Sequence, residues 1–561
     1  MRLLCILGVL LCLTIHASAL DREAFSFTRY DLDLTLDPGQ QRLGVRGKIT
    51  LRNDSDAPQR FVTLQISSSL HWASIQMADK SAEFVTQTYA SDVDHTGGLS
   101  EAIVTLPKPL APKDTVNLTV GYEGVIPQDT TRLTRVGVPA NTAKDSDWDQ
   151  ISASFTGLRG IGYVVWYPIA AHAANMSDPS SLSETVGRWK RRERDAEMVA
   201  SVAFLAASDR QRLFCGDVGL AALDKPAACL WRDLDANVPF FVVSAQELLA
   251  RPSADIFYLP EHKSGANDYA MALKQVEPSI AVWLGQHSSG EGTRARVIDL
   301  PYPDAAPFES GNTWLMPLTA DETSLLLMAV QQSAKLNFLS PRPWISLGLQ
   351  GYAQVRYIEQ EKSRETAQAY LQSHREALID AERSLPGSDP AMRSLINSTD
   401  EFYVRTKATN VWWMLRELVG ETALTAALHN YKAEEDKDAM YMQRLIEAQS
   451  HRDLAWFFDD WVYRDRGLPD FRITSVFARA VVGGGYLVTV TAENLGGAAA
   501  EVPVILRMST KDAVEKLVVP GKSKASVRIL AGSTPIRAIV NDGSVPESDT
   551  RNNEYTIELN Q

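Results

Sequence analysis

The stretch that decides the fold is TADETSLLLMAVQQSAKLNFLSPRPWISLGL, residues 319–349. Apolar residues recur at helical spacing from Leu325 to Leu336. Thr319 and Glu322, just before this run, form the pattern of a capping box, which predicts the start of a helix. A second helical pattern runs over 345–380. The stretch therefore predicts two consecutive helices.

Helical patterns continue on both sides of this stretch. In residues 264–284, Tyr269, Leu273, Val276 and Ile280 follow the period of a helix. Gly467 and Pro469 end the last pattern, as residues that stop helices do. Besides those of the opening stretch, we predict helices over residues 264–284, 406–418, 421–431, 442–448 and 453–463.

Strand patterns flank the helical part. Tyr30, Leu32, Leu34 and Leu36 alternate with polar residues, and the turn at 37–39 leads to a second alternating run that ends at Leu51. This predicts a hairpin with one buried face. Further strand patterns are those of residues 102–106, 116–120, 199–206 and 238–243. They predict an all-β region of about 220 residues.

After residue 470 the strand patterns return. Residues 486–491 and 502–508 alternate, and Gly483, Gly484 and Gly485 predict a turn between strands. We therefore expect a small β-sandwich at the end of the chain.

Length and composition limit the class of protein. The 561 residues are 45% hydrophobic and 22% charged, which predicts several folded domains and excludes overall disorder. Asp and Glu (69) outnumber Lys and Arg (56), for a net charge of −13. A nucleic-acid binder needs a basic surface, so we expect no nucleic-acid partner.

The first residues predict export. A short apolar run from Leu3 to Ile15 is followed by Ala17-Ser18-Ala19, the pattern of a signal peptide cleaved after Ala19. We expect a secreted or periplasmic protein with no membrane span after cleavage. Cleavage would leave two cysteines, Cys215 and Cys229. In an exported protein they are a candidate disulfide, and two buried thiols are the alternative.

Histidines are few and far apart. None of the 9 histidines lies four residues from another, and the two nearest neighbours are His429 and His451. No helix can therefore present two imidazoles to one metal ion.

Three stretches carry a resemblance to a known family. SPRPWISLGL (340–349) is similar to a W-L-N-E-G-F segment, and RTKA (405–408) with WWMLR (412–416) is similar to a Y-x-K-G-A…L-R helix. DLAWFFDDWVY (453–463), with its later proline, is similar to D-L-x-x-F-F-x-x-W…P. In this order the motifs resemble the membrane alanyl aminopeptidase family of gluzincin zinc metallopeptidases.

The resemblance implies a multidomain α+β fold. It comprises a saddle-like N-terminal β-sandwich domain, a thermolysin-like mainly helical domain and a C-terminal β-sandwich. We place a signal peptide at 1–19 and these domains at 20–247, 248–470 and 471–561. Members of the family cleave N-terminal residues from peptides with one zinc, held by H-E-x-x-H and by a Glu on the next helix.

The zinc motif is missing from this chain. By its distance to the 340–349 segment, Gln331 stands at the first His, Gln332 at the general-base Glu and Lys335 at the second His. Leu347 stands at the third ligand. A lysine ammonium and a leucine cannot bind zinc. We therefore predict no catalytic residue, no metal ligand and no cofactor.

Two further positions match functional residues of the family. Arg405 replaces the Tyr that stabilises the oxyanion, with Tyr403 two residues before it. Glu309 occupies the Glu position of a faint G-A-M-E-N echo, or is a solvated carboxylate of a loop. An arginine can still hold a carboxylate in a bidentate contact.

We expect six residues to line the former catalytic groove and to bind a peptide or a protein ligand: Glu309, Gln331, Gln332, Lys335, Tyr403 and Arg405. The alternative for Lys335 is a structural ion pair with a nearby acid. The chain is thus interpreted as an exported pseudoenzyme, aminopeptidase-like but non-catalytic. One alternative is an active zinc aminopeptidase with atypical ligands such as His262, His287 or His374, and another is a structural cell-envelope protein.

Overall fold

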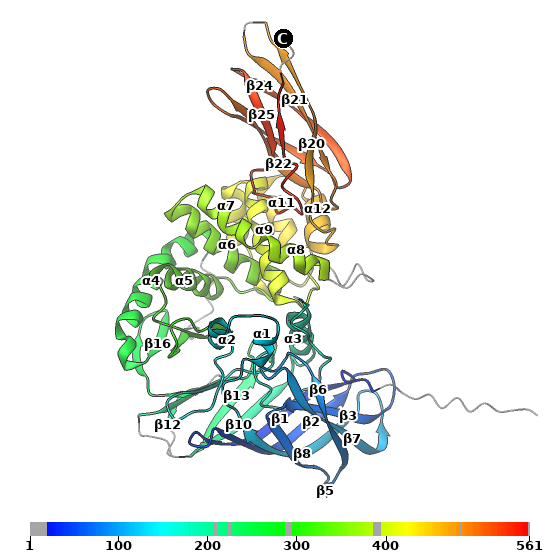
Figure 1. The fold of residues 1–561 in the computed structure, drawn as a ribbon, viewed down its shortest axis with the longest axis vertical. Coiled ribbons are helices and arrows are strands. Elements are labelled where there is room, and N and C mark those ends of the chain that lie inside the picture. Colours follow the sequence, from blue (N-terminus) through cyan, green and yellow to red (C-terminus); the bar gives the residue numbers. More distant parts are fainter. Residues whose placement is uncertain are drawn as a thin grey trace, which may run out of the picture.

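The computed structural model describes residues 20–178, 180–205, 210–216, 218–222, 226–285, 294–384, 394–482 and 484–558. Figure 1 shows three regions along the longest axis: a β-rich N-terminal region, a mainly helical middle and a β-rich C-terminal region. The predicted multidomain α+β class is confirmed. The expected signal peptide lies outside the described residues and stays a prediction.

Two sheets of the N-terminal region pack around one hydrophobic core. The larger has seven strands in the order β13-β10-β1-β2-β8-β4-β5, and the smaller has the order β3-β7-β6. Leu34 on β1 and Leu64 on β3 belong to the same buried cluster. The strands are β1 Phe25–Asp37, β2 Arg42–Asn53, β3 Gln59–Ser67, β4 Leu70–Met77, β5 Lys80–Ser81, β6 Glu83–Ala90, β7 Gly98–Leu110, β8 Thr115–Val125, β10 Glu197–Phe204 and β13 Ala227–Arg232.

The hairpin predicted at residue 30 is confirmed. β1 and β2 pair antiparallel, with Tyr30 opposite Ile49 and Leu34 opposite Val45. These four side chains are buried, because alternate residues of a strand point to the same face.

A four-stranded sheet adjoins this core, in the order β12-β11-β14-β9. Its strands are β9 Thr156–Leu158, β11 Arg212–Cys215, β12 Val218–Ala222 and β14 Phe241–Ser244. A disulfide joins Cys215 of β11 to Cys229 of β13. It thus links the four-stranded sheet to the seven-stranded one.

The strand patterns predicted an all-β N-terminal region, and this prediction is wrong. The region also contains the helices α1 Thr131–Arg135, α2 Ala140–Ser146 and α3 Ser181–Arg192. The buried positions of α3 are Thr185, Gly187, Trp189 and Lys190. Trp189 follows the partly buried Leu182 and Val186 at helical spacing, and this short apolar stripe lies in an otherwise polar and basic run.

The middle region begins with a sheet that the sequence patterns do not predict. Its order is β15-β16-β17-β19-β18, with α4 (Lys263–Leu284) crossing between the parallel strands β16 and β17. The strands are β15 Glu247–Ala250, β16 Ala254–Tyr258, β17 Ala295–Asp299, β18 Phe308–Ser310 and β19 Thr313–Met316. They are short, and β16, β17 and β19 are largely buried, so alternation is absent. The predicted domain boundary at 247/248 falls at the start of β15.

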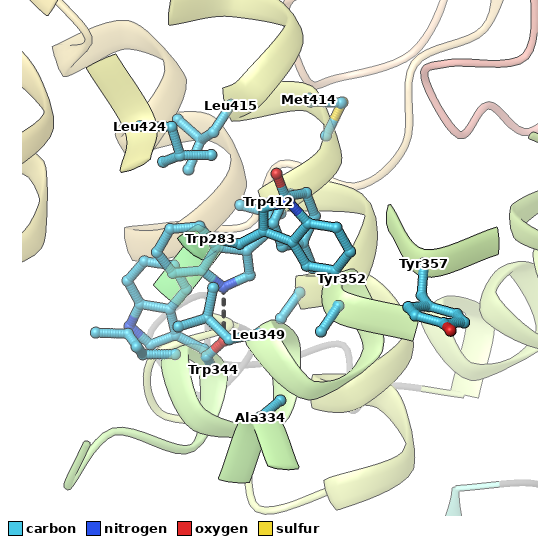
Figure 2. Packing of buried hydrophobic residues seen from close by; sticks show 14 of the residues in the cluster. Trp283, Ala334, Trp344, Leu349, Tyr352, Tyr357, Trp412, Met414, Leu415 and Leu424 are labelled. Carbon is cyan, nitrogen blue, oxygen red and sulfur yellow. Dashed lines mark hydrogen bonds between the residues drawn. The ribbon is translucent and has the colours of Figure 1, made fainter. Parts of the chain in front are cut away.

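The helices of the middle region follow. They are α5 Glu322–Asn337, α6 Pro343–Glu361, α7 Arg364–Ser373, α8 Arg375–Ser384, α9 Glu401–Val419, α10 Glu421–His429, α11 Tyr441–Ser450 and α12 Ala455–Phe458, with a π-helical turn at Asp459–Tyr463. Figure 2 shows their core, in which Trp344 of α6 stacks on Trp412 of α9 with ring centroids 5.3 Å apart.

Two local predictions in this region are wrong. The N-cap of α5 is Asp321, whose carboxylate accepts from the Ser324 N–H, so Thr319 forms no capping box. The single pattern over 345–380 is three helices. The Ser363 hydroxyl caps α7 by accepting from the Thr366 N–H, and α7 ends at its C-cap His374, directly before α8.

The C-terminal region is the predicted sandwich of two sheets, with orders β20-β21-β24 and β23-β22-β25-β26. Its strands are β20 Phe471–Ala480, β21 Tyr486–Asn494, β22 Ala500–Met508, β23 Ala513–Val519, β24 Ser523–Ala531, β25 Pro535–Val540 and β26 Glu554–Thr556. Gly484 and Gly485 have positive φ between β20 and β21, and Gly483 lies outside the described residues. In the part of the chain that is described, no helix is long and apolar enough to cross a membrane.

Candidate functional site

Two cavities of about 710 and 820 Å³ lie between the N-terminal and helical regions. Both are lined by Lys190, Glu309, Glu401 and Arg405, so they adjoin along a charged wall. We call the pair of cavities the cleft. Helix α3, strand β18 and helix α9 supply these four side chains.

The first cavity has a largely apolar lining. Side chains from all three of these elements, from β19 and from α5 contribute to it. Among them are Leu182, Phe308, Trp314, Met328 and Phe402. A concave apolar wall beside a few charged groups is typical of a site for a small ligand.

Lys335 and Glu309 form an ion pair at the wall between the cavities. The Lys335 ammonium on α5 contacts Glu309 Oε1 and the carbonyl oxygen of Gly311. It also lies 5.0 Å from the ring centroid of Trp314, which stands opposite Glu309 in the pairing of β18 with β19. The structural ion pair considered for Lys335 is therefore present. The second oxygen of Glu309, Oε2, is buried and accepts no hydrogen bond.

Gln331 lies one helical turn before Lys335, on the same face of α5. Its amide is 3.5 Å from Gln350 Oε1 on α6. Arg405 Nη1 on α9 donates to the same Gln350 oxygen at 3.1 Å. The three side chains thus connect α5, α6 and α9 beside the cleft.

Arg405 is the unusual charge here. Within the described residues its guanidinium forms no ion pair, and its one hydrogen bond is the contact with Gln350. Lys190, by contrast, contacts the carboxylate of Glu401. Arg405 therefore keeps donors free in a half-buried cleft.

The structure brings the three expected zinc-ligand positions to the same cleft. Gln331 lines the first cavity, and Lys335 and Leu347 line the second. They present an amide, an ion-paired ammonium and an alkyl group. This set does not fit zinc, which takes nitrogen, sulfur or oxygen lone pairs from its ligands. Within the described ranges, no three His, Cys, Asp or Glu side chains gather in a group that could hold a metal ion.

Gln332 does not line the cleft. It is fully buried and accepts a hydrogen bond from the Tyr269 hydroxyl at 2.7 Å. Burial raises the pKa of Tyr269, which keeps that hydroxyl protonated as a donor. One residue along a helix turns the side chain by about 100°, so Gln331 and Gln332 face different surroundings.

Tyr403 does not line the cleft either. Its hydroxyl lies in a buried cluster, where it donates to Asp465 and accepts from Lys407 Nζ at 2.9 Å. Lys407 also contacts Asp465 and lies 2.7 Å from Glu382. Burial, reinforced by these two carboxylates, raises the pKa of Tyr403. The cluster ties α8 and α9 to the segment before β20.

Among the polar residues of the cleft that the sequence patterns miss are Lys190, Gln350 and Glu401. Lys190 lies in the basic run RWKRRER (188–194), and only that charge run marks it. Gln350 follows directly after the 340–349 segment, and nothing in the sequence marks this glutamine as a residue of the cleft. Glu401 begins α9 four residues before Arg405, which places both on one face.

The histidines of the zinc alternative have other contacts. His262 Nδ1 lies 2.8 Å from Asp299 Oδ2, and His374 Nδ1 lies 3.0 Å from the carbonyl oxygen of Tyr370. His287 lies outside the described residues.

No protein-family model and no curated protein matches the chain. Solved structures do match. An M1 zinc metallopeptidase from Deinococcus radiodurans is 18% identical, with a TM-score of 0.44 over 80% of this chain and 96% of that one. A mutant of it, bound to a Tyr-Ser-Ala substrate, is 17% identical over the same shares, with a TM-score of 0.45. These neighbours belong to the superfamily that the sequence motifs resemble, at an identity and TM-score that say nothing about the chemistry of this chain.

Proposed function

We propose that the chain is an exported, non-catalytic relative of the gluzincin aminopeptidases that binds peptides in the cleft. The observation that carries the proposal is the ion pair of Lys335 with Glu309. It fills, with a paired ammonium, a position at which the resembled family holds zinc. Gln331 and Leu347 at the other two ligand positions support the same reading.

The chemistry of hydrolysis has no support from the residues at the cleft. A zinc peptidase needs three ligands and a base within hydrogen-bond reach of the bound water. Gln332, at the position of the base, is an amide that contacts Tyr269 in the core. An amide cannot take a proton from water at neutral pH.

Binding has better support. The two cavities have the size usual for sites that hold a small ligand, about 300–1,000 Å³. An apolar wall on one side suits a side chain, and free donors on Arg405 suit a polar group of a peptide.

Export is part of the proposal. The pattern of residues 1–19 supports it, and so does the disulfide between Cys215 and Cys229, because disulfides persist in oxidising compartments.

Metal analysis and peptide titration of the purified chain test the proposal. We expect unmodified tripeptides to bind in calorimetry without being cleaved, and no stoichiometric zinc. One zinc per chain with hydrolysis of aminoacyl amides contradicts it, and so does the absence of any peptide binding.

A pair of variants locates the binding. Met328→Trp fills the apolar cavity from α5 and should weaken peptide binding by at least about tenfold. Met271→Trp, at an exposed position of α4, is the matched control and should bind as the parent does. Equal binding by both variants places the peptide outside the cleft.

A further inference from the structure

We infer that the cleft holds a peptide by its C-terminal carboxylate, on Arg405, with the last side chain, a large apolar one, in the first cavity. This inference rests on the proposed function and names the end of the peptide that is recognised. It follows from the charges of the wall that both cavities share and from the side chains next to Arg405.

Both carboxylates of the shared wall already have a cationic partner. Glu309 contacts the ammonium of Lys335, and Glu401 contacts that of Lys190. Glu309 Oε2 is buried and so is closed to a ligand. The N-terminal ammonium of a peptide would therefore compete with an internal lysine for either carboxylate.

Arg405 has no such partner. Its guanidinium forms no ion pair within the described part of the chain. An arginine has five N–H donors, and the hydrogen bond to Gln350 uses one of them. The remaining donors can hold both oxygens of a carboxylate in a planar, bidentate contact.

Gln350 holds the guanidinium in place. Its side-chain oxygen accepts a hydrogen bond from Arg405 Nη1 at 3.1 Å and lies 3.5 Å from the side-chain nitrogen of Gln331. The arginine is thus oriented before a ligand arrives, which lowers the entropy lost on binding.

Apolar side chains lie next to this anion site. Phe402 precedes Arg405 by three residues on α9, and Met328 precedes Gln331 by three residues on α5, so each pair shares a helix face. Both apolar side chains line the first cavity, together with Trp314. A carboxylate on Arg405 therefore has a large apolar pocket within reach of the same residue of the ligand.

Calorimetry with matched tripeptides tests the inference. Ala-Ala-Phe, its C-terminal amide and its N-acetylated form are titrated into the full-length protein. We expect the amide to bind at least about tenfold more weakly than the free acid, because it loses the charge-assisted contacts. The N-acetylated acid should bind within about threefold of the free peptide, because its carboxylate is unchanged.

Two variants of equal charge change assign the effect to Arg405. Arg405→Gln should bind the acid and the amide equally. Arg188→Gln removes an arginine of α3 that pairs with Glu184 and does not line the cleft, and it should keep the parent's preference for the acid.

The outcomes separate the two proposals. Equal binding of acid and amide by the parent overturns the carboxylate inference and leaves peptide binding standing. A loss of binding on N-acetylation overturns it too. Binding of 3-phenylpropanoate as tight as that of Ala-Ala-Phe assigns the site to small apolar acids and overturns the peptide part. If none of the tripeptides binds, the proposed function fails, and this inference with it.

Discussion

At the scale of single residues, Lys335 decides what the cleft can hold. Its side chain is about one-fifth exposed, and its ammonium contacts Glu309, the carbonyl oxygen of Gly311 and the face of Trp314. A cation with this many partners is part of the structure of the cleft. Of the four charges on the wall that both cavities share, Arg405 is the one that forms no ion pair within the described residues.

Replacing Lys335 with Met should destabilise the protein. The apolar stem remains, but Glu309 is left as a partly buried carboxylate without a cation. We expect a loss of about 1–3 kcal/mol in the free energy of unfolding. Urea unfolding followed by tryptophan fluorescence measures it.

The double variant Lys335→Met with Glu309→Gln is the control, because it removes the unpaired charge together with its partner. It should regain most of the loss. A single variant as stable as the parent would show that the ion pair contributes nothing.

At the scale of elements, the close approach of α6 and α9 positions two sides of the cleft. Trp344 and Trp412 stack between these helices, and the Trp412 indole N–H donates to the Trp344 carbonyl oxygen at 3.3 Å (Figure 2). Gly348 follows Trp344 by one turn of α6, at the contact with α9. A Cβ atom there would lie 2.6 Å from Ala408 Cβ and 2.7 Å from Trp412 Cδ1.

Gly348→Ala should therefore separate the two helices. Overpacking of this kind costs about 1–3 kcal/mol of stability, and the shift of α9 would also weaken peptide binding. Thermal unfolding and calorimetry measure the two effects. Gly532→Ala, where an added Cβ has nothing within 4 Å, is the matched control and should leave both unchanged.

The disulfide connects two sheets of the N-terminal region. It closes a short loop, with 14 residues of sequence separation between Cys215 and Cys229. Replacing both cysteines with Ala should cost about 3 kcal/mol, since the unfolded chain regains the freedom of that loop. Unfolding curves of the parent with and without a reductant should show the same difference, and identical curves would argue against the bond.

At the scale of the whole molecule, the C-terminal sandwich is tied to the helices through the loop before β26. Arg375 of α8 donates to the carbonyl oxygens of Glu547 and Ser548 at 2.7 and 2.9 Å. Gln368 of α7 donates to Asp542 at 3.0 Å. The Glu547 carboxyl points into the sandwich, where Asn541 and the Phe471 N–H donate to it.

The stability of this part should fall as pH rises from about 4.5 to about 7. Burial raises the pKa of Glu547 from 4.5 to about 7, despite the hydrogen bonds it accepts. Between these values the folded chain keeps a proton that the unfolded chain releases, so raising the pH favours unfolding. The loss is on the order of 3 kcal/mol in full.

Urea unfolding at pH 5 and pH 8 checks this dependence. Glu547→Gln cannot titrate and should reduce the dependence, leaving the part that comes from Glu193, whose pKa burial raises to about 8. Glu554→Gln, at an exposed position of β26, should leave the dependence as in the parent. A loss of stability between pH 5 and pH 8 that is as large in Glu547→Gln as in the parent would exclude this role for Glu547.

The sequence by itself determined the order of β, helical and β regions, and the elements with a strong period. The hairpin from residue 30 and the helices around 319–349 follow from the spacing of apolar residues, because burial of one face sets that spacing locally. The spacing of apolar residues did not predict the sheet from β15 to β19 or helix α3. Short buried strands lack alternation, and the apolar stripe of α3 is only three residues long, Leu182, Val186 and Trp189, in an otherwise polar and basic run.

Only the tertiary structure decided which candidate residues meet. Lys335 and Glu309 form a pair across 26 residues of chain, whereas Gln332 and Tyr403 turn into separate buried contacts. Residue type and spacing indicate which groups share a helix face. They cannot indicate which faces oppose one another, because that depends on how α5, α9 and β18 pack across long stretches of chain.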